Sequence, residues 1–318
     1  MTVDLALIQE AYQRIGPVVH KTPMLHTQQL SQMTDCDLTL KAENLQITGS
    51  FKIRGALNKV AGVAQTSPAG VVTGSSGNHG QAVAWAARHF HLQAYIVVPT
   101  TASAAKIDAA QSYGAHVEQY GTTSRDRLER AQAVAQERSM AFVAPYDDPL
   151  VIAGQGTAGL EILEQRPDVQ VVLVPIGGGG LISGIATAIK SLRPDIRVIG
   201  VEPLGAPKAF QSRRQHRLVV LPETDTIADG LKSLALGDLT YPIIERRVDD
   251  LVTVDDDEIR HAMELLLSRQ KILAEPSGAA TLAYALRRPE QLRGRKVAAV
   301  ISGGNIDMPS LCRIIGMA

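Results

Sequence analysis

The stretch that decides the fold runs from Val174 to Gly184 and reads Val-Pro-Ile-Gly-Gly-Gly-Gly-Leu-Ile-Ser-Gly. An apolar segment leads into four consecutive glycines and then into a helical pattern, which is the order of a strand, a tight turn and a helix. A turn without Cβ atoms lets backbone N–H groups surround an anion at a helix N-terminus, where the helix dipole also favours negative charge. The stretch therefore predicts a phosphate-binding turn made of Gly177, Gly178, Gly179 and Gly180.

The same stretch argues against two common nucleotide sites. It matches neither the G-x-G-x-x-G pattern of dinucleotide-binding folds nor the G-K-S/T ending of a P-loop. The alternative interpretation is a tight, flexible turn that binds nothing. Four glycines in a row cost backbone entropy, which favours the phosphate-binding interpretation.

Apolar, β-branched segments alternate with amphipathic helical patterns on both sides of this turn, which predicts an α/β fold with parallel sheets. The predicted strands are 71–73, 94–98, 116–119, 169–174, 198–201 and 297–301, and the clearest predicted helices are 81–90 and 125–138. The chain has 318 residues, above the about 250–300 at which single cores stop growing, so two open-sheet domains are expected.

No repeat, low-complexity tract or Pro/Gly/Ser-rich linker separates the two expected domains, so we predict that they are interleaved along the chain. The turn-rich segment APYDDP, 144–149, is the best candidate for a crossing point because its prolines interrupt both strand and helix. The predicted large, cofactor-binding domain comprises 1–69 and 148–318, and the predicted small, substrate-capping domain comprises 70–147.

Composition limits the partners and the compartment. Lys and Arg together number 32, as do Asp and Glu, so the formal net charge is zero, which argues against nucleic acid or a membrane surface as partner. Cys36 and Cys312 are too few for a disulfide framework, and no N-terminal signal segment or membrane span is present. We expect a cytoplasmic protein with a small-molecule ligand.

A second glycine-containing turn, GSSGNHG at 74–80, follows the predicted strand 71–73 and precedes a helix. Ser75, Ser76 and Asn78 offer polar side chains, and the N–H groups at the helix start could hold a carboxylate. The alternative is an ordinary helix cap, since Ser and Asn are the usual capping residues.

Two further residues, Lys52 and Ser302, could take part in cofactor chemistry. Lys52 lies between Phe51 and Ile53 in TGSFKIRG, and partial desolvation there would lower its pKa and make it an amine for Schiff-base chemistry. Ser302 follows the predicted strand 297–301, at the sheet edge where ligands bind, and its hydroxyl could meet a heteroaromatic nitrogen. Taken alone, Lys52 could be an ordinary solvated lysine and Ser302 an ordinary serine at a strand end. Together with the glycine turns 74–80 and 177–180, they match what pyridoxal phosphate and an amino acid require.

At these residues the sequence resembles the fold-type II pyridoxal-phosphate enzymes, the tryptophan synthase β-like group, and within it the serine/threonine dehydratases and serine racemases. The similarity covers nearly the whole chain. The matching segments, in the family's order, are KAENLQITGSFKIRGA, SSGNHGQA, AYIVVP, VIAGQGT, PIGGGGLISG, TIADGLK, AEPSGA and SGGN. No regulatory extension follows Ala318, so the chain resembles the short, catabolic kind of dehydratase.

The resemblance implies a role for each matching residue. Lys52 would bind the cofactor covalently and move the Cα proton, and Phe51 would pack on the cofactor ring. Asn78 would hold the 3-oxygen, 177–180 the phosphate, and Ser302 the pyridine nitrogen. The residues that would bind the substrate carboxylate are Ser75, Ser76, Gly77, Asn78 and His79. Ser76 would also lie opposite Lys52, as in racemases, which makes it a second catalytic candidate.

Two positions bear on which member of the family this is. Racemases of the group have a divalent-metal site, and here Glu202 and Ala206 are kept while Lys208 stands where an acidic ligand would be. An ammonium cannot bind a metal but could take its place beside Glu202, so we predict no metal site; the alternative is that Lys208 points to solvent. Arg125 aligns with a residue that faces the substrate side chain, so it could hold a second carboxylate, although a solvated helix arginine is the alternative.

The function that the resemblance implies is a lyase, an L-threonine/L-serine ammonia-lyase acting as a homodimer. Loss of the Cα proton and the 3-hydroxyl would lead to a 2-oxo acid and ammonia. A 3-hydroxyaspartate dehydratase, a serine racemase with side dehydratase activity and a non-catalytic pyridoxal-phosphate-binding protein remain the alternatives.

Overall fold

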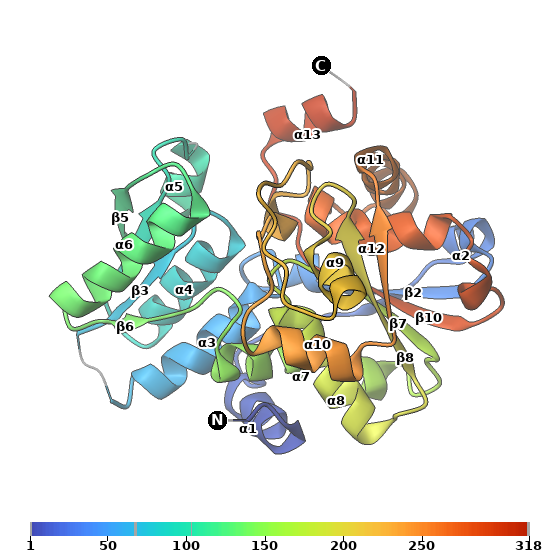
Figure 1. The fold of residues 1–318 in the computed structure, drawn as a ribbon, viewed down its shortest axis with the longest axis horizontal. Coiled ribbons are helices and arrows are strands. Elements are labelled where there is room, and N and C mark those ends of the chain that lie inside the picture. Colours follow the sequence, from blue (N-terminus) through green and yellow to red (C-terminus); the bar gives the residue numbers. More distant parts are fainter. Residues whose placement is uncertain (1, 67–68, 103, 317–318) are drawn as a thin grey trace.

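The computed structural model describes residues 2–66, 69–102 and 104–316, and its strands form two separate open sheets (Figure 1). The expected α/β class is confirmed, with a four-stranded sheet at one end of the molecule and a six-stranded sheet at the other. Each predicted strand is present at or within a few residues of its predicted bounds. None of the described helices has the length and apolar character needed to cross a membrane.

The six-stranded sheet has the order β1-β2-β10-β7-β8-β9, and only the β1–β2 pair is antiparallel. Its strands are β1 (Met24–His26), β2 (Asp37–Ala42), β7 (Val171–Pro175), β8 (Arg197–Pro203), β9 (Asp250–Val254) and β10 (Lys296–Ile301). Because parallel strands end at the same edge, the residues that follow β7 and β10, Gly177 and Ser302, lie at one edge with the end of β8.

The four-stranded sheet is wholly parallel and has the order β5-β4-β3-β6. Its strands are β3 (Val71–Gly74), β4 (Ala94–Val98), β5 (His116–Gln119) and β6 (Ala141–Phe142). The helices α4 (Asn78–His89), α5 (Ala104–Ser112) and α6 (Ser124–Glu137) follow its strands in the order of successive βα units.

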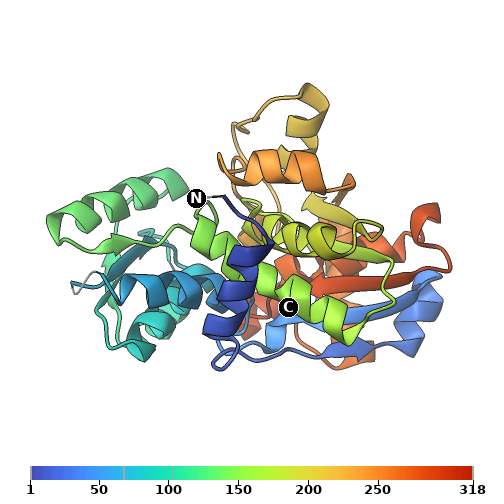
Figure 2. The same cartoon turned by 90° about the horizontal axis from the view of Figure 1, so that it is seen from below.

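The remaining helices pack around the six-stranded sheet or lie between the two sheets. They are α1 (Leu5–Ile15), α2 (Gln28–Thr34), α3 (Lys52–Val63), α7 (Pro149–Gln165), α8 (Gly180–Leu192), α9 (Lys208–Gln215), α10 (Thr240–Arg247), α11 (Asp256–Leu265), α12 (Pro276–Leu286) and α13 (Met308–Ile314). Short helical turns are Glu43–Leu45, Asp229–Leu231, Leu266–Gln270 and Glu290–Leu292. Figure 2 shows α1 crossing α7, with which it is in contact.

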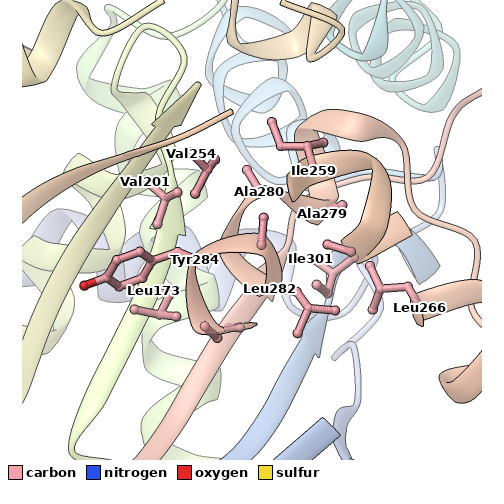
Figure 3. Close-up of a cluster of buried hydrophobic side chains, with 14 of the residues drawn as sticks. Leu173, Val201, Val254, Ile259, Leu266, Ala279, Ala280, Leu282, Tyr284 and Ile301 are labelled. Carbon is pink, nitrogen blue, oxygen red and sulfur yellow. The ribbon is translucent and has the colours of Figure 1, made fainter. Parts of the chain in front are cut away.

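The largest core lies between the six-stranded sheet and helices α11 and α12 (Figure 3). Leu173 of β7, Val201 of β8 and Ile301 of β10 meet Ala280 and Tyr284 of α12 there. Small alanines on α12 let the helix approach the strands closely, as a fully buried helix requires. This packing fixes the sheet edge at which β7, β8 and β10 end.

The chain crosses from one sheet to the other at 143–148, between β6 and α7, which packs against α8 and α3. Helix α3 is shared, because its apolar residues form one core with the four-stranded sheet while it also packs on α7. The predicted domain boundaries at 69/70 and 147/148 remain a prediction. Lys52, the first residue of α3, lies between the end of β10 and the crossing segment, and therefore between the two sheets.

Candidate active site

The glycine turn lies between β7 and α8, as the sequence predicts. Gly179 has a φ of 95° and precedes the first residue of α8, a left-handed conformation that favours glycine. In the ranges that the structure describes, the N–H groups of Gly177, Gly178 and Gly179 donate no hydrogen bond. A Cβ on Gly178 would lie 2.3 Å from ring atoms of Tyr146. The turn is therefore a row of free donors at a helix N-terminus, which suits a phosphate group.

Lys52 and Ser302 are brought together by backbone pairing. The N–H of Phe51 donates to the carbonyl of Ser302 at 3.0 Å, and Ser50 forms an antiparallel bridge with Gly303. The Ser302 side chain is buried, and its Oγ is 3.5 Å from the carbonyl of Ser277. The lysine and the strand-end serine, far apart in sequence, thus belong to one site.

The amine of Lys52 is held by the crossing segment. Its Nζ donates to the carbonyl of Pro145 at 2.6 Å and lies 5.3 Å from the centroid of the Phe51 ring. Burial lowers the pKa of Lys52 to about 8, although the nearby charge of Glu275 acts in the opposite direction. The neutral, nucleophilic amine is therefore available close to neutral pH.

The start of α3 is anchored by a buried ionic network. Arg54 is fully buried and makes two hydrogen bonds to the carboxylate of Glu43, at 2.7 and 2.8 Å, and two to that of Glu161, at the same distances. Lys41 of β2 donates to Glu161 at 2.6 Å. Burial alone would raise the pKa of Glu43, but the Arg54 guanidinium holds it below its ordinary value. Since buried charges are stable only when fully paired, this network anchors the first turn of α3, which begins at Lys52.

Asn78 joins the same site through two amide contacts. Its Nδ2 donates to Glu275 Oε1 at 2.7 Å, and its Oδ1 accepts from Asn305 at 2.8 Å. Asn305 also donates to the carbonyl of Thr48 at 2.7 Å. Sequence reasoning missed Glu275 and Asn305, although both lie in or directly beside the segments AEPSGA and SGGN. Neither residue belongs to a recognisable chemical pattern until the fold brings it to Asn78.

The turn 74–80 connects β3 to α4, and its remaining predicted residues line the start of that helix. Ser75 and Ser76 are partly buried, and Ser75 Oγ accepts from the N–H of Gly77 at 3.3 Å. A Cβ on Gly80 would lie 2.1 Å from the carbonyl of Ser75, so the turn can close only with glycine there. The N–H groups at this helix start remain the natural place for a carboxylate.

The His79 side chain is neutral and buried. Burial, together with the charge of Lys52, lowers the pKa of His79 to about 3, so the ring is neutral at physiological pH. Its Nε2 lies 3.1 Å from the carbonyl of Val143, which can only accept, so Nε2 holds the proton. The imidazole is buried, and its Nε2 faces the backbone directly after β6, so the ring brings no positive charge to a bound carboxylate.

The structure does not bring Arg125 to the other predicted residues. Its side chain is 83% exposed and pairs with Glu129 of the same helix at 2.7 Å. Residues two apart on a helix lie about 200° apart, so Arg127 faces the opposite side. The carbonyl of Arg127 packs against Gly74, directly before the 74–80 turn, and burial lowers the pKa of its guanidinium while Asp229 counteracts this. The inward arginine of α6 is thus Arg127.

Lys208 is fully buried, and its Nζ donates to Glu202 Oε1 at 2.9 Å and to the carbonyl of Ala206 at 3.1 Å. The alternative of a solvent-facing lysine is wrong. An ammonium cannot bind a cation, and it holds the two groups that the resemblance assigns to a divalent metal, so the residues here do not fit such a metal. Within the described ranges, no three His, Cys, Asp or Glu side chains are grouped as a metal site.

These features together fit pyridoxal phosphate: free N–H groups at a glycine turn, an amine with a lowered pKa, and a buried hydroxyl at a strand end. Comparison with known proteins agrees. Residues 15–303 match the family described as "PALP: Pyridoxal-phosphate dependent enzyme". The chain is 44% identical to an L-threonine ammonia-lyase of Thermotoga maritima, with 98% of this chain and 78% of that protein aligned.

Two further relatives carry different names. A serine racemase of Arabidopsis thaliana is 44% identical, over 97% of this chain and 95% of that protein. An L-threo-3-hydroxyaspartate ammonia-lyase of Saccharomyces cerevisiae is 40% identical, over 97% and 95%. The solved structure of maize serine racemase superposes with a TM-score of 0.93 at 39% identity, covering 100% of this chain and 98% of that one. The chain therefore belongs to the family of pyridoxal-phosphate dependent enzymes.

Proposed function

We propose that this chain is an ammonia-lyase that converts L-threonine or L-serine to a 2-oxo acid and ammonia. The observation that supports it most is the Lys52 amine, whose pKa is lowered to about 8 and which is tied to the Ser302 strand end through the Phe51 backbone. An L-threonine ammonia-lyase and serine racemases are among its relatives at 40% identity or more. Both names refer to small amino acids.

Pyridoxal phosphate, when bound, withdraws electrons from the Cα of an amino acid. In our proposal the N–H groups of 177–180 bind the phosphate, Phe51 packs against the ring and Asn78 binds its 3-oxygen. Lys52 Nζ holds the cofactor and takes the Cα proton. The neutral Ser302 hydroxyl would meet the ring nitrogen without forcing it to be charged, which would suit elimination of the 3-hydroxyl.

The substrate carboxylate is bound in this proposal by residues 75–79. Backbone N–H groups at the start of α4 supply the donors, and the neutral His79 ring adds no charge. Ser76 lies opposite Lys52 in the proposal, so it could return a proton to the other face of Cα. Formation of D-serine from L-serine is the outcome that would favour the racemase alternative.

The direct test is 2-oxo acid release from L-serine, L-threonine and both diastereomers of 3-hydroxyaspartate. We expect release from serine and threonine, together with an equal amount of ammonia. Cofactor binding with no turnover of any of the four would instead favour a non-catalytic pyridoxal-phosphate-binding protein.

Hydroxyaspartate is the second candidate substrate, because Arg127 of α6 is partly buried, its backbone carbonyl packs against Gly74, and a yeast relative bears that substrate's name. If Arg127 binds the second carboxylate, Arg127→Ala should lower kcat/KM on L-threo-3-hydroxyaspartate by about ten- to hundredfold and leave serine nearly unchanged. Arg125→Ala is the matched control and should change neither. Equal losses on both substrates with Arg127→Ala would mean that Arg127 only supports the fold.

Cofactor attachment should depend on pH through Lys52. Only the neutral amine reacts, so the rate at which apoenzyme binds pyridoxal phosphate covalently should rise about tenfold per pH unit and level off near the pKa of about 8. Glu275→Gln removes the charge that raises the pKa of Lys52, so the midpoint of the pH profile of cofactor attachment should lie at lower pH in this variant. Stopped-flow absorbance measures both. A midpoint near the ordinary lysine value of about 10.4 would contradict a desolvated amine.

Activity should not depend on divalent metal. The Lys208 ammonium already neutralises Glu202 at 2.9 Å, so dialysis against a chelator should leave turnover unchanged and added Mg²⁺ should not raise it. Lys208→Asp, which restores an acidic group, is the informative comparison and should make activity or thermal stability respond to Mg²⁺. Loss of parent activity on chelation, with recovery on Mg²⁺ addition, would refute this account of Lys208.

We also propose that the chain is a cytoplasmic homodimer. The resemblance to its family supports the dimer, and a sequence with only two cysteines, too few for a disulfide framework, supports the compartment. Light scattering coupled to size-exclusion chromatography of the purified holoenzyme tests the dimer, and a monomeric mass would contradict it.

A further inference from the structure

Two buried side chains donate hydrogen bonds to backbone carbonyls at the glycine turn. The first is Lys208, whose Nζ donates to the carbonyl of Ile176 at 3.0 Å and to that of Leu231 at 3.2 Å, in addition to Glu202 and Ala206. An ammonium has three N–H donors, so these four acceptors share them. Ile176 directly precedes Gly177, and its carbonyl is therefore fixed toward the ammonium.

The second side chain is Thr240, the first residue of α10, which is fully buried. Its Oγ1 donates to the carbonyl of Gly178 at 2.7 Å and accepts from the N–H of Gly237 at 2.8 Å. A Cβ on Gly179 would lie 2.9 Å from this hydroxyl, so the threonine packs directly against the turn. The carbonyl of Gly178 is thereby fixed toward Thr240.

Asp147 of the crossing segment fixes Thr240 in turn. Its carboxylate accepts from the N–H groups of Asp238 and Leu239, each at 3.0 Å, and of Thr240 at 3.3 Å. The preceding residue, Tyr146, has its ring against Gly178. The crossing segment thus contacts the turn directly and also through Thr240.

Because each peptide group is planar, fixing its carbonyl also fixes the direction of the N–H group in the same peptide. In a planar trans peptide the C=O and the following N–H point in opposite directions. With the Ile176 carbonyl held by Lys208, the N–H of Gly177 must point away from the ammonium. With the Gly178 carbonyl held by Thr240, the N–H of Gly179 must point away from the hydroxyl. These are two of the N–H groups that donate no hydrogen bond within the described ranges.

We propose that Lys208 and Thr240 are positioning residues that orient the N–H groups of Gly177 and Gly179 toward the cofactor phosphate and so set cofactor affinity. The proposal rests on the assignment of 177–180 as the phosphate site. It adds two residues outside the glycine turn, each of which acts through a carbonyl at the turn. It also gives Lys208 a function in the site without any metal.

The test compares binding of pyridoxal phosphate and of pyridoxal, which lacks the phosphate, to apoenzyme prepared from purified holoenzyme. Thr240→Val removes only the hydroxyl and should raise the Kd for pyridoxal phosphate about tenfold, with pyridoxal affinity unchanged. Thr240→Ser keeps the hydroxyl and should restore affinity. Lys208→Met, made together with Glu202→Gln so that no lone charge is buried, should show the same phosphate-specific loss.

Thermal unfolding of each apoenzyme controls for folding. Equal weakening of pyridoxal phosphate and pyridoxal by Thr240→Val would overturn the proposal, because a general structural defect does not distinguish the two ligands. Parent affinity in Thr240→Val would also overturn it. The assignment of 177–180 as the phosphate site is tested separately by Gly178→Asp. If Gly178→Asp loses the cofactor while Thr240→Val retains it, the phosphate site is supported and only the positioning role of Thr240 is wrong.

Discussion

Replacement of Lys52 by alanine is expected to abolish covalent attachment of pyridoxal phosphate and to lower turnover of L-serine and L-threonine by about 10³-fold or more. Lys52 is the amine at the site, with its Nζ 2.6 Å from the Pro145 carbonyl and a pKa lowered to about 8. The substitution removes both the group that binds the cofactor and the group proposed to take the Cα proton. The absorbance spectrum of the purified variant and 2-oxo acid release are the measurements.

Lys59→Ala is the matched control for this variant. Lys59 lies on the same helix, α3, but pairs with Asp148 at 2.6 Å, so its loss should leave the cofactor spectrum and turnover intact. A Lys52→Ala enzyme that kept a covalent cofactor would show that another lysine binds it.

The second large effect is expected for Gly178→Asp, which should weaken pyridoxal phosphate binding by at least about 100-fold. The substitution adds a negative charge at a helix N-terminus that suits a phosphate, and its Cβ meets the Tyr146 ring. Gly178→Asn has nearly the same size without the charge, so the difference between the two variants isolates electrostatics from sterics. Equilibrium dialysis of both apoenzymes gives the two dissociation constants.

Unfolding temperature separates this effect from a folding defect. We expect the apoenzymes of Gly178→Asp and Gly178→Asn to unfold at similar temperatures while their cofactor affinities differ. If Gly178→Asp retained the full complement of cofactor after purification, the glycine turn would not be the phosphate site.

Much of the fold was predictable because its signals are local. The run from 169 to 184 predicts a strand, a glycine turn and a helix, and the structure contains β7, the turn and α8. Continuous apolar runs of β-branched residues identified β3, β4, β8 and β10 for the same reason, since strands buried on both faces need apolar side chains throughout. The parallel strands β2, β6 and β9 were not predicted. The crossing segment was predictable because proline interrupts both kinds of element.

The directions of side chains were less predictable because tertiary contacts decide them. His79 follows Asn78 in the same motif, yet its ring turns to the Val143 carbonyl, an acceptor supplied by a distant segment. Arg125 and Arg127 look alike in sequence, and only the packing of α6 on β3 decides which faces inward. Lysine is usually exposed, and nothing local indicates that Lys208 is buried among carbonyl oxygens.

The proposed mechanism depends most on the identity of the lysine that binds the cofactor. Borohydride reduction of the purified holoenzyme, followed by peptide mapping, fixes the cofactor on the lysine that holds it. The proposed mechanism predicts a single modified peptide containing Phe51, Lys52 and Ile53, and no modification of that peptide in enzyme stripped of cofactor beforehand. Label on any other lysine, or no label in enzyme that contains pyridoxal phosphate, would contradict it.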